Sequence, residues 1–547
     1  MKIRTLFAAS LAVVAMGASA QTHQEGAEYY KADQLDNAKE LLLRNLNNAG
    51  TDKAIANYYL GLIASDENKL DEAQKYFEAG IEANPNYANN YIGLGGLALK
   101  KGDKKTAGEQ FKKGESLVKK DAAAEIAIAR AYYDADPVGY AKEIEGKVAK
   151  ARKINLQSPA IYIFEGDQEK DMKNWGGAAG KYEMAKSYDA NATEAYVKYA
   201  NLYTQVNPQY AITMLKELLS VNPTSALGQR ELANAYYNKK DYADAAREYG
   251  VYVKNPNHFK QDEDRYAFLL FYSQDYKKGY DYATQLLASN PGNFTARRYQ
   301  FMNAANLPEM ADKLVPMAEE LLAAHNANPD KNKFAAIDFI LIAEEFVKAK
   351  RADEAITVLQ EAIKEMPENA NFNKQLAMTY VETENFSGAS DTFEGFIAKS
   401  ENPGYNDYIQ QAIFSFYAGV ENKQKADQAK ADTYFNKAKA NVEKAQAEIP
   451  DNYKPKKILG DIALQYATND DEVKTAAFPM YSEAAELLEK SSDPSRYKSD
   501  AKTIYNYLGN YYLDHKDVAK AKENFNKYLQ YDPENEGYRK FVEGLKE

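Results

Sequence analysis

The stretch YNYLGNYYLDHKDVAKAKENFNKYLQYDPEN, residues 505–535, has the pattern of two amphipathic helices joined by a short polar turn. Apolar residues recur three and four positions apart in each half, which is the spacing of a single helix face. Small residues at Gly509 and Ala521 allow two helix backbones to approach closely, and Phe525 can fill the space beside them. The stretch therefore predicts a helical hairpin.

The same small and aromatic positions recur along the chain at a fixed interval of 34 residues. The matching pairs are Gly61 and Gly95, Ala73 and Ala107, Phe77 and Phe111, Gly166 and Ala200, Ala233 and Ala267, Ala245 and Gly279, Ala343 and Ala377, and Ala355 and Ala389. A chance alternation of helices would not keep one interval. A helix-turn-helix unit of this length resembles the tetratricopeptide repeat. The resemblance implies an all-α fold, an α-solenoid of tandem hairpins that form a right-handed superhelix.

Polar residues and prolines mark the turns of these units. Side-chain oxygens that can cap the second helix are expected at Asp103, Asp241, Asp275, Asn385 and Asp517. Prolines that follow the end of the second helix are Pro85, Pro223, Pro291, Pro367 and Pro533. The tail ENEGYRKFVEGLKE continues as one amphipathic helix, with Tyr538, Phe541 and Leu545 on a shared face, and we expect it to cap the last repeat.

The spacing becomes irregular in the second half, which predicts longer helices or loops there. The interval from Ala389 to Ala431 is 42 residues instead of 34. The predicted organisation is a signal peptide (1–20), an N-terminal repeat segment (21–158), a central repeat segment (159–293), an irregular extended repeat (294–335), a further repeat segment (336–402), an irregular segment with insertions (403–500), and a final repeat with its capping helix (501–547).

The first twenty residues, MKIRTLFAASLAVVAMGASA, have the order of a secretory signal peptide. Lys2 and Arg4 precede an apolar run, and Ala18-Ser19-Ala20 closes it. We therefore expect a mature chain that begins at Gln21 and has no transmembrane span. An uncleaved membrane anchor is the alternative, but the run is shorter than a span requires.

The composition excludes several classes of function. The chain has no Cys, which rules out disulfides, thiolate metal sites and a lipid anchor on cysteine. The net charge is −11, and removal of Lys2 and Arg4 with the signal peptide makes it −13. An acidic chain repels a phosphate backbone, so nucleic acid is not an expected partner.

No reactive constellation is recognisable in the sequence. The four histidines, His23, His258, His325 and His515, are far apart, and no two share a helical turn. A metal site or a catalytic triad would need convergence across distant repeats. We therefore predict no catalytic residues, no metal ligands and no cofactor.

The resemblance also implies where a partner would bind. In this repeat family the first helix of each repeat lines a concave groove that holds peptides or partner helices. The corresponding candidate residues here are Asn201, Arg230, Asn234, Tyr237 and Asn238. They resemble the arrangement with which some members hold the C-terminal carboxylate of a peptide. Val197 and Asp264 stand where a full clamp would have basic residues, and ordinary solvated polar residues remain the alternative.

These observations together predict a non-enzymatic scaffold of the bacterial cell envelope, periplasmic or associated with the outer membrane. Its partners would be other envelope proteins or peptides, while its oligomeric state is left open. Two alternatives stay open at this stage. One is a glycan-binding or nutrient-binding envelope protein, and the other is an enzyme with a site between repeat segments.

Overall fold

The computed structural model describes residues 22–491 and 494–546, and every regular element in these ranges is a helix. The predicted signal peptide and Gln21, the predicted N-terminus of the mature chain, lie outside the described residues. The chain divides into two compact units, with the division between Asn303 and Ala304. The finer segment boundaries stay predictions.

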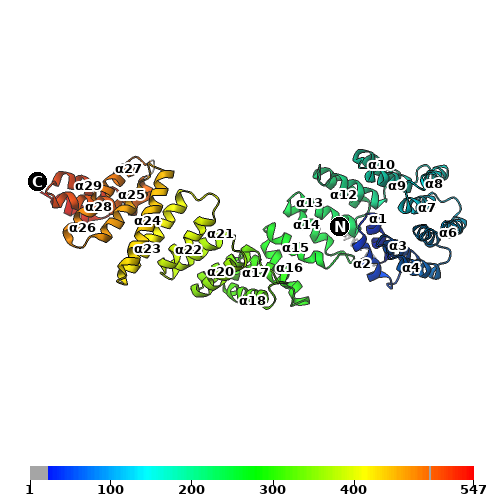
Figure 1. Cartoon of the computed structure of the whole chain (residues 1–547), viewed down its shortest axis with the longest axis horizontal. Helices are drawn as coiled ribbons and strands as arrows, with labels where there is room; N and C mark the ends of the chain where they lie inside the picture. Colours follow the sequence, from blue (N-terminus) through cyan, green and yellow to red (C-terminus); the bar gives the residue numbers. More distant parts are fainter. Residues whose placement is uncertain (1–21, 492–493, 547) are drawn as a thin grey trace, which may run out of the picture. The chain divides into compact units, whose positions relative to one another are not determined.

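The first unit consists of antiparallel helical hairpins (Figure 1). Its helices are α1 (His23–Lys31), α2 (Leu35–Asn45), α3 (Lys53–Asp66), α4 (Leu70–Ala83), α5 (Ala88–Lys100), α6 (Lys104–Leu117), α7 (Ala122–Ala135), α8 (Ala141–Ile154), α9 (Pro159–Asp171), α10 (Trp175–Tyr188), α11 (Thr193–Tyr203), α12 (Pro208–Val221), α13 (Ala226–Asn238), α14 (Tyr242–Tyr252), α15 (Gln261–Tyr272) and α16 (Tyr276–Ser289); α17 (Phe294–Ala304) ends at the division.

The second unit continues the hairpin pattern with longer and additional elements. Its helices are η1 (Pro308–Lys313), α18 (Leu314–Ala327), α19 (Ala336–Lys348), α20 (Ala352–Glu365), α21 (Ala370–Glu382), α22 (Phe386–Lys399), α23 (Tyr405–Gln424), α24 (Gln428–Glu448), α25 (Tyr453–Tyr466), α26 (Asp470–Ala476), α27 (Phe478–Glu489), η2 (Pro494–Tyr497), α28 (Lys498–Asp514), α29 (Val518–Tyr531) and α30 (Glu536–Gly544).

A contact between a small residue and an aromatic ring closes many of the hairpins, as the sequence predicts. A Cβ atom added to Gly61 would overlap the Phe77 ring, and one added to Gly509 would overlap Phe525. The same relation holds between Gly95 and Phe111, Gly166 and Tyr182, and Gly419 and Phe435. Ala245 and Ala521, on the facing second helices, have no exposed surface. Close backbone approach is thus built into each of these pairs.

The predicted caps are present with one exception. The side chains of Asp103, Asp241, Asn385 and Asp517 each accept a hydrogen bond from a backbone N–H in the first turn of the following helix. Asp275 precedes α16 without such a bond. The five predicted prolines all follow within two residues of a helix end. The sequence therefore predicts most of the helix caps and the prolines that follow the helix ends.

The irregular spacings have visible causes in the second unit. Helix α23 has 20 residues, whereas α21 has 13, and this accounts for most of the long interval from Ala389 to Ala431. The 21 residues of α24 lengthen the spacing that follows Ala431. Further along, the short helices α26 and η2 are additions to the hairpin pattern. The predicted capping helix is α30, where Tyr538 and Phe541 contact the Phe525 ring with centroids 5.6 and 5.4 Å away.

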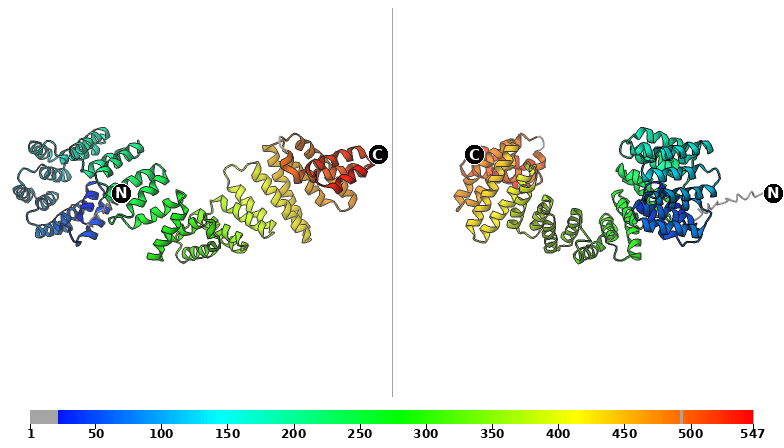
Figure 2. Two further views of the ribbon diagram at one scale, coloured as in Figure 1. Left: turned by 180° about the vertical axis from the view of Figure 1, so that it is seen from behind. Right: turned by 45° about the vertical axis from the view of Figure 1, so that its right-hand side comes forward.

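The first unit curves back on itself, so that its first helix contacts helices near residue 200 (Figures 1 and 2). Helix α1 packs against both α11 and α13. Tyr29 of α1, which has no exposed surface, meets Phe259 edge to face at 5.4 Å. The hairpin α1–α2 therefore closes one turn of the solenoid. Among the described residues, no helix has both the length and the apolar character needed to cross a membrane.

Candidate functional site

A pocket of about 500 Å³ lies on the inner face of the first unit, and we call it the inner pocket. Its walls come almost entirely from the first helices of successive hairpins. Its lining residues are Tyr30, Lys31, Asp33, Leu35, Tyr58, Tyr59, Leu62, Asp66, Asn89, Ala123, Ile126, Ala127, Arg130, Asp134, Ala160, Ile163, Asp167, Glu194 and Lys198. Helices α1, α3, α5, α7, α9 and α11 all contribute, so the 34-residue period itself places these side chains around one space.

Tyrosines form one wall of the inner pocket. The Tyr59 ring lies 5.4 Å from the Tyr30 ring and 5.1 Å from the Tyr58 ring. Burial raises the pKa of each of these three hydroxyls well above its ordinary value, so the groups stay neutral. The Tyr30 hydroxyl donates to Asp66 at 3.1 Å. This wall offers flat apolar area together with polar tips.

A network of paired charges forms another wall of the inner pocket. Asp167 accepts from Arg130 at 2.6 Å and from Lys198 at 2.9 Å, and Lys198 also donates to Asp33 at 2.8 Å. Burial disfavours the charged form of Asp167, but Arg130 and Lys198 outweigh it and hold its pKa below the ordinary value. These bonds join α1–α2 to α7, α9 and α11, so the wall is fixed in position before any ligand arrives.

Asp134 is a carboxylate of the inner pocket that is available to bind a ligand. It makes no hydrogen bond or ion pair with any residue in the described part of the chain. Loss of hydration beside the protein disfavours the charged carboxylate and raises the pKa of Asp134 to about 6. The positive charge of Arg130 opposes this shift, and the negative charge of Asp66 adds to it. Asp134 is accessible to solvent at the end of α7. A cation from a ligand could therefore reach it.

Arg230, the central residue of the predicted clamp, is already paired within the chain. Its guanidinium donates to both carboxylate oxygens of Asp262, at 2.6 and 3.3 Å, and its side chain is only 13% exposed. A third bond reaches Gln34 in the α1–α2 turn at 3.4 Å, and Phe259 lies against the guanidinium at 5.2 Å. Arg230 is therefore largely buried and paired within the chain, and it is not an open groove residue.

The other four predicted residues differ in their surroundings. Asn234 accepts from the Tyr249 hydroxyl at 2.6 Å, and Tyr237 packs against Phe268 with ring centroids 6.1 Å apart. Asn201 and Asn238 are exposed near the ends of α11 and α13. Binding through these residues stays a prediction. The inner pocket is lined by residues of α1 to α11 and includes none of the five predicted residues.

Acidic side chains of α1 lie at the N-terminal end of α13. Glu25 accepts from the backbone N–H groups of Ala226 and Leu227 at the start of α13, at 2.9 and 3.4 Å. Glu28 accepts from the Ser225 hydroxyl at 3.2 Å. Burial raises the pKa of Glu25 to about 8, with Glu28 as the next cause, while the two backbone bonds oppose the shift. No local sequence signal marks this contact, because its partners are about 200 residues apart.

Two segments of the chain, residues 201–257 and residues 346–404, match models of the tetratricopeptide repeat. No curated protein sequence matches the chain.

Solved structures with similar folds are at low identity. The C-terminal part of a TPR repeat-containing protein from Cytophaga hutchinsonii is 18% identical, covers 52% of this chain and 100% of its own length, with a TM-score of 0.40. A tetratricopeptide repeat protein from Parabacteroides merdae is 14% identical, covers 56% of this chain and 99% of its own, with a TM-score of 0.30. Yeast Tom70 is 17% identical, covers 85% of this chain and 99% of its own length, and has a TM-score of 0.29.

Proposed function

We propose that this chain, in which two segments match the tetratricopeptide repeat, is a non-enzymatic scaffold of the bacterial cell envelope that binds an extended segment of a partner protein in the inner pocket. The observation that carries this proposal is the convergence of six consecutive first helices on one preformed pocket. Neighbouring repeats hold the pocket walls rigidly, so a partner would bind without the cost of ordering them.

The chemistry of the pocket favours a segment with a basic side chain beside apolar or aromatic residues. Most of the charged groups that line the pocket are neutralised by partners within the chain, as Asp167 is by Arg130 and Lys198. Asp134 has no such partner among the described residues, so a lysine or arginine of the bound segment would complete its hydrogen bonding. Tyr58 and Tyr59 would contact the neighbouring side chains of that segment.

The envelope location is supported by the first twenty residues. Lys2, Arg4, the apolar run and Ala18-Ser19-Ala20 have the order of a secretory leader, and export would place the inner pocket among envelope proteins. The absence of Cys is compatible with an oxidising compartment, because no thiol is present to be oxidised there.

The experiment has two steps. The chain from Gln21 is used as bait in a pull-down from cell-envelope extract, and a labelled peptide from the captured protein is titrated against variants. Asp134→Asn should weaken binding about ten- to a hundredfold, through loss of a charge-assisted hydrogen bond. Binding to the unsubstituted chain should strengthen as the pH rises through about 6, because the carboxylate then carries its charge.

Asp514→Asn is the matched control. Asp514 is an exposed aspartate at the end of α28, a first helix of the second unit that borders a separate groove. Its substitution should leave affinity unchanged. A result in which Asp514→Asn weakens binding and Asp134→Asn does not would place the site in the second unit and remove the inner pocket from the proposal.

A further inference from the structure

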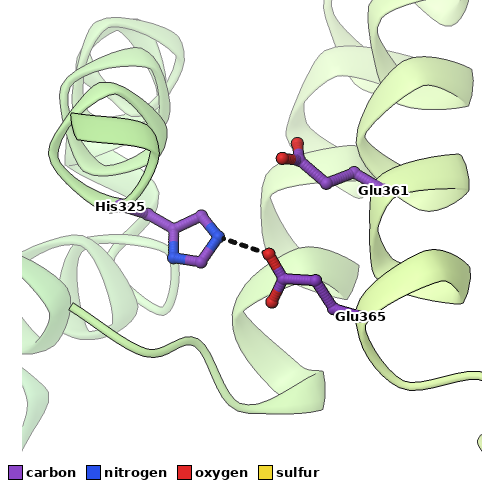
Figure 3. Close-up of side chains that lie close together, drawn as sticks. All are labelled: His325, Glu361 and Glu365. Carbon is purple, nitrogen blue, oxygen red and sulfur yellow. Dashed lines mark hydrogen bonds and ion pairs between the residues drawn. The ribbon is translucent and has the colours of Figure 1, made fainter. Parts of the chain in front are cut away.

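A histidine and two glutamates come together in the second unit, against the prediction that no metal ligands converge (Figure 3). His325 lies on α18, and Glu361 and Glu365 lie on α20. One ligand atom of each residue falls within 4.8 Å of the others. Figure 3 shows both carboxylates directed toward the imidazole. No local sequence motif marks this cluster, because His325 and Glu361 are 36 positions apart.

The imidazole of His325 is fixed in an orientation that presents its Nε2 atom to the glutamates. The residue is 1% exposed, and its ring stacks on Phe334 with centroids 4.0 Å apart and planes 9° apart. Its Nδ1 atom lies 2.8 Å from the carbonyl oxygen of Asn332. A carbonyl oxygen can only accept, so Nδ1 carries the proton. Backbone carbonyls orient metal-binding histidines in this way.

The remaining contacts leave a place for a cation. Nε2 of His325 lies 3.0 Å from Glu365 Oε1, and in the neutral imidazole both atoms are acceptors, which repel unless a proton or a metal ion stands between them. Glu361 makes no hydrogen bond or ion pair with any residue that the structure describes. Two carboxylates four residues apart on one helix face also repel each other. A divalent cation would remove both conflicts.

We propose that His325, Glu361 and Glu365 bind a divalent transition-metal ion, with Zn²⁺ as the best match. One imidazole nitrogen and two carboxylate oxygens are ligands that zinc accepts, whereas Mg²⁺ and Ca²⁺ prefer oxygen alone. Ligand atoms on one tetrahedral zinc ion are about 3.3 to 3.4 Å apart when each bond is about 2.0 to 2.1 Å. The observed 3.0 Å between Nε2 and Oε1 would lengthen slightly on binding, and ligand atoms that lie up to 4.8 Å apart would draw closer. The ion would tie α18 to α20.

The chain offers a matched control in the first unit. His258 has the same kind of surroundings, with Nδ1 2.7 Å from the Asn255 carbonyl oxygen and Nε2 2.9 Å from Glu263 Oε1. Within the described residues no second carboxylate completes a group of three around it. His258 therefore tests whether a carbonyl, a histidine and one glutamate are enough for binding.

The test is calorimetric titration of the chelator-treated full chain with Zn²⁺. We expect one saturable site whose affinity falls by at least about tenfold in Glu361→Gln, is lost in His325→Asn, and is unchanged in His258→Asn. Glu361→Gln removes a partly exposed ligand and keeps the contact between His325 and Glu365, so its fold should persist, as circular dichroism can confirm. No saturable binding by the unsubstituted chain, or equal affinity in a folded Glu361→Gln variant, would overturn the proposal. So would loss of binding in His258→Asn.

Discussion

The two ends of this chain complete their hairpin arrays in different ways. At the start, α1–α2 packs against α11 and α13 through buried charges and aromatic rings about 200 residues away in sequence. At the end, α30 packs on the last hairpin, where Phe525 meets Tyr538 and Phe541 and the Tyr538 hydroxyl donates to Asn506 of α28. One end thus depends on long-range polar pairing and the other mainly on local apolar contact. The contrast shows that one repeat pattern can be closed by tertiary contact or by a simple cap.

The largest effect is expected from Arg230→Ala. Asp262 is 5% exposed as a side chain, and removal of its guanidinium partner would leave a buried charge with the Tyr252 hydroxyl as its remaining side-chain donor. Such a loss costs about 3 to 5 kcal/mol of unfolding free energy. Phe541→Ala, at the other end, removes a ring that is 44% exposed and should cost less. Urea denaturation of both variants checks the comparison, and equal midpoints would contradict it.

The second largest effect is a dependence of the free energy of unfolding on pH, which we expect from Glu25 at the N-terminal end of the array. The pKa of Glu25 is about 8 in the folded chain against an ordinary value of 4.5, so the folded state holds this proton more tightly. The free energy of unfolding should therefore fall as the pH rises from about 4.5 to about 8, by an amount on the order of 2 to 4 kcal/mol.

Glu25→Gln should remove this dependence, because the amide does not ionise. Hydrogen exchange of α1 amides, measured from pH 5 to pH 9 in the two proteins, is the direct readout once the intrinsic exchange rates are divided out. Protection of α1 that decreases equally in both proteins would assign the pH dependence to another group.

The two units should respond alike to overpacking. Ala245 and Ala521 have no exposed surface and stand at close helix approaches in the first and second unit. Substitution of either by Leu should cost about 1 to 3 kcal/mol, since the added side chain has no room. Thermal and urea denaturation should give similar losses at both positions. A neutral Ala521→Leu would mean that the last hairpin is more loosely packed than the structure shows.

The smallest effect concerns the caps, which both units use. Asp103 accepts from the backbone N–H of Thr106 at 3.0 Å, and Asp103→Ala should cost about 1 kcal/mol. Asp275 occupies the same position before α16 without a capping bond, so Asp275→Ala should cost less. The difference between the two urea midpoints is the measurement. If Asp275→Ala were the more costly change, the capping assignment at Asp103 would be wrong.

The sequence predicted what depends on short separations. Gly509 and Phe525 are 16 residues apart and their contact was expected, as were the caps at Asp103 and Asp517. The bond from Arg230 to Asp262 was missed, because it depends on how two successive hairpins are rotated against each other. That rotation accumulates from small packing differences in every repeat and is not encoded at one position.

The inner pocket shows the same limit on a larger scale. Its tyrosines could be assigned to helices from the sequence, and the family resemblance implied an inner groove. The sequence could not show that Asp134 lacks a partner while Arg230 has one. Both outcomes depend on how α11 and α13 come back to contact α1, about ten helices further along the chain. The meeting of His325 with Glu361 is likewise a matter of how α18 and α20 pack.

The return of α1 to α13 also sets an order for biosynthesis. A ribosome makes the N-terminal helix first, yet the groups that Glu25 caps, at Ala226 and Leu227, are added about 200 residues later. The Asp262 carboxylate that binds Arg230 beside Gln34 comes later still. Local hairpins can form as they emerge, but contacts of such long sequence separation form slowly. Helix α1, which is synthesised before all of these partners, is therefore among the last segments of the first unit to reach its final position, and until then its apolar face needs protection from aggregation.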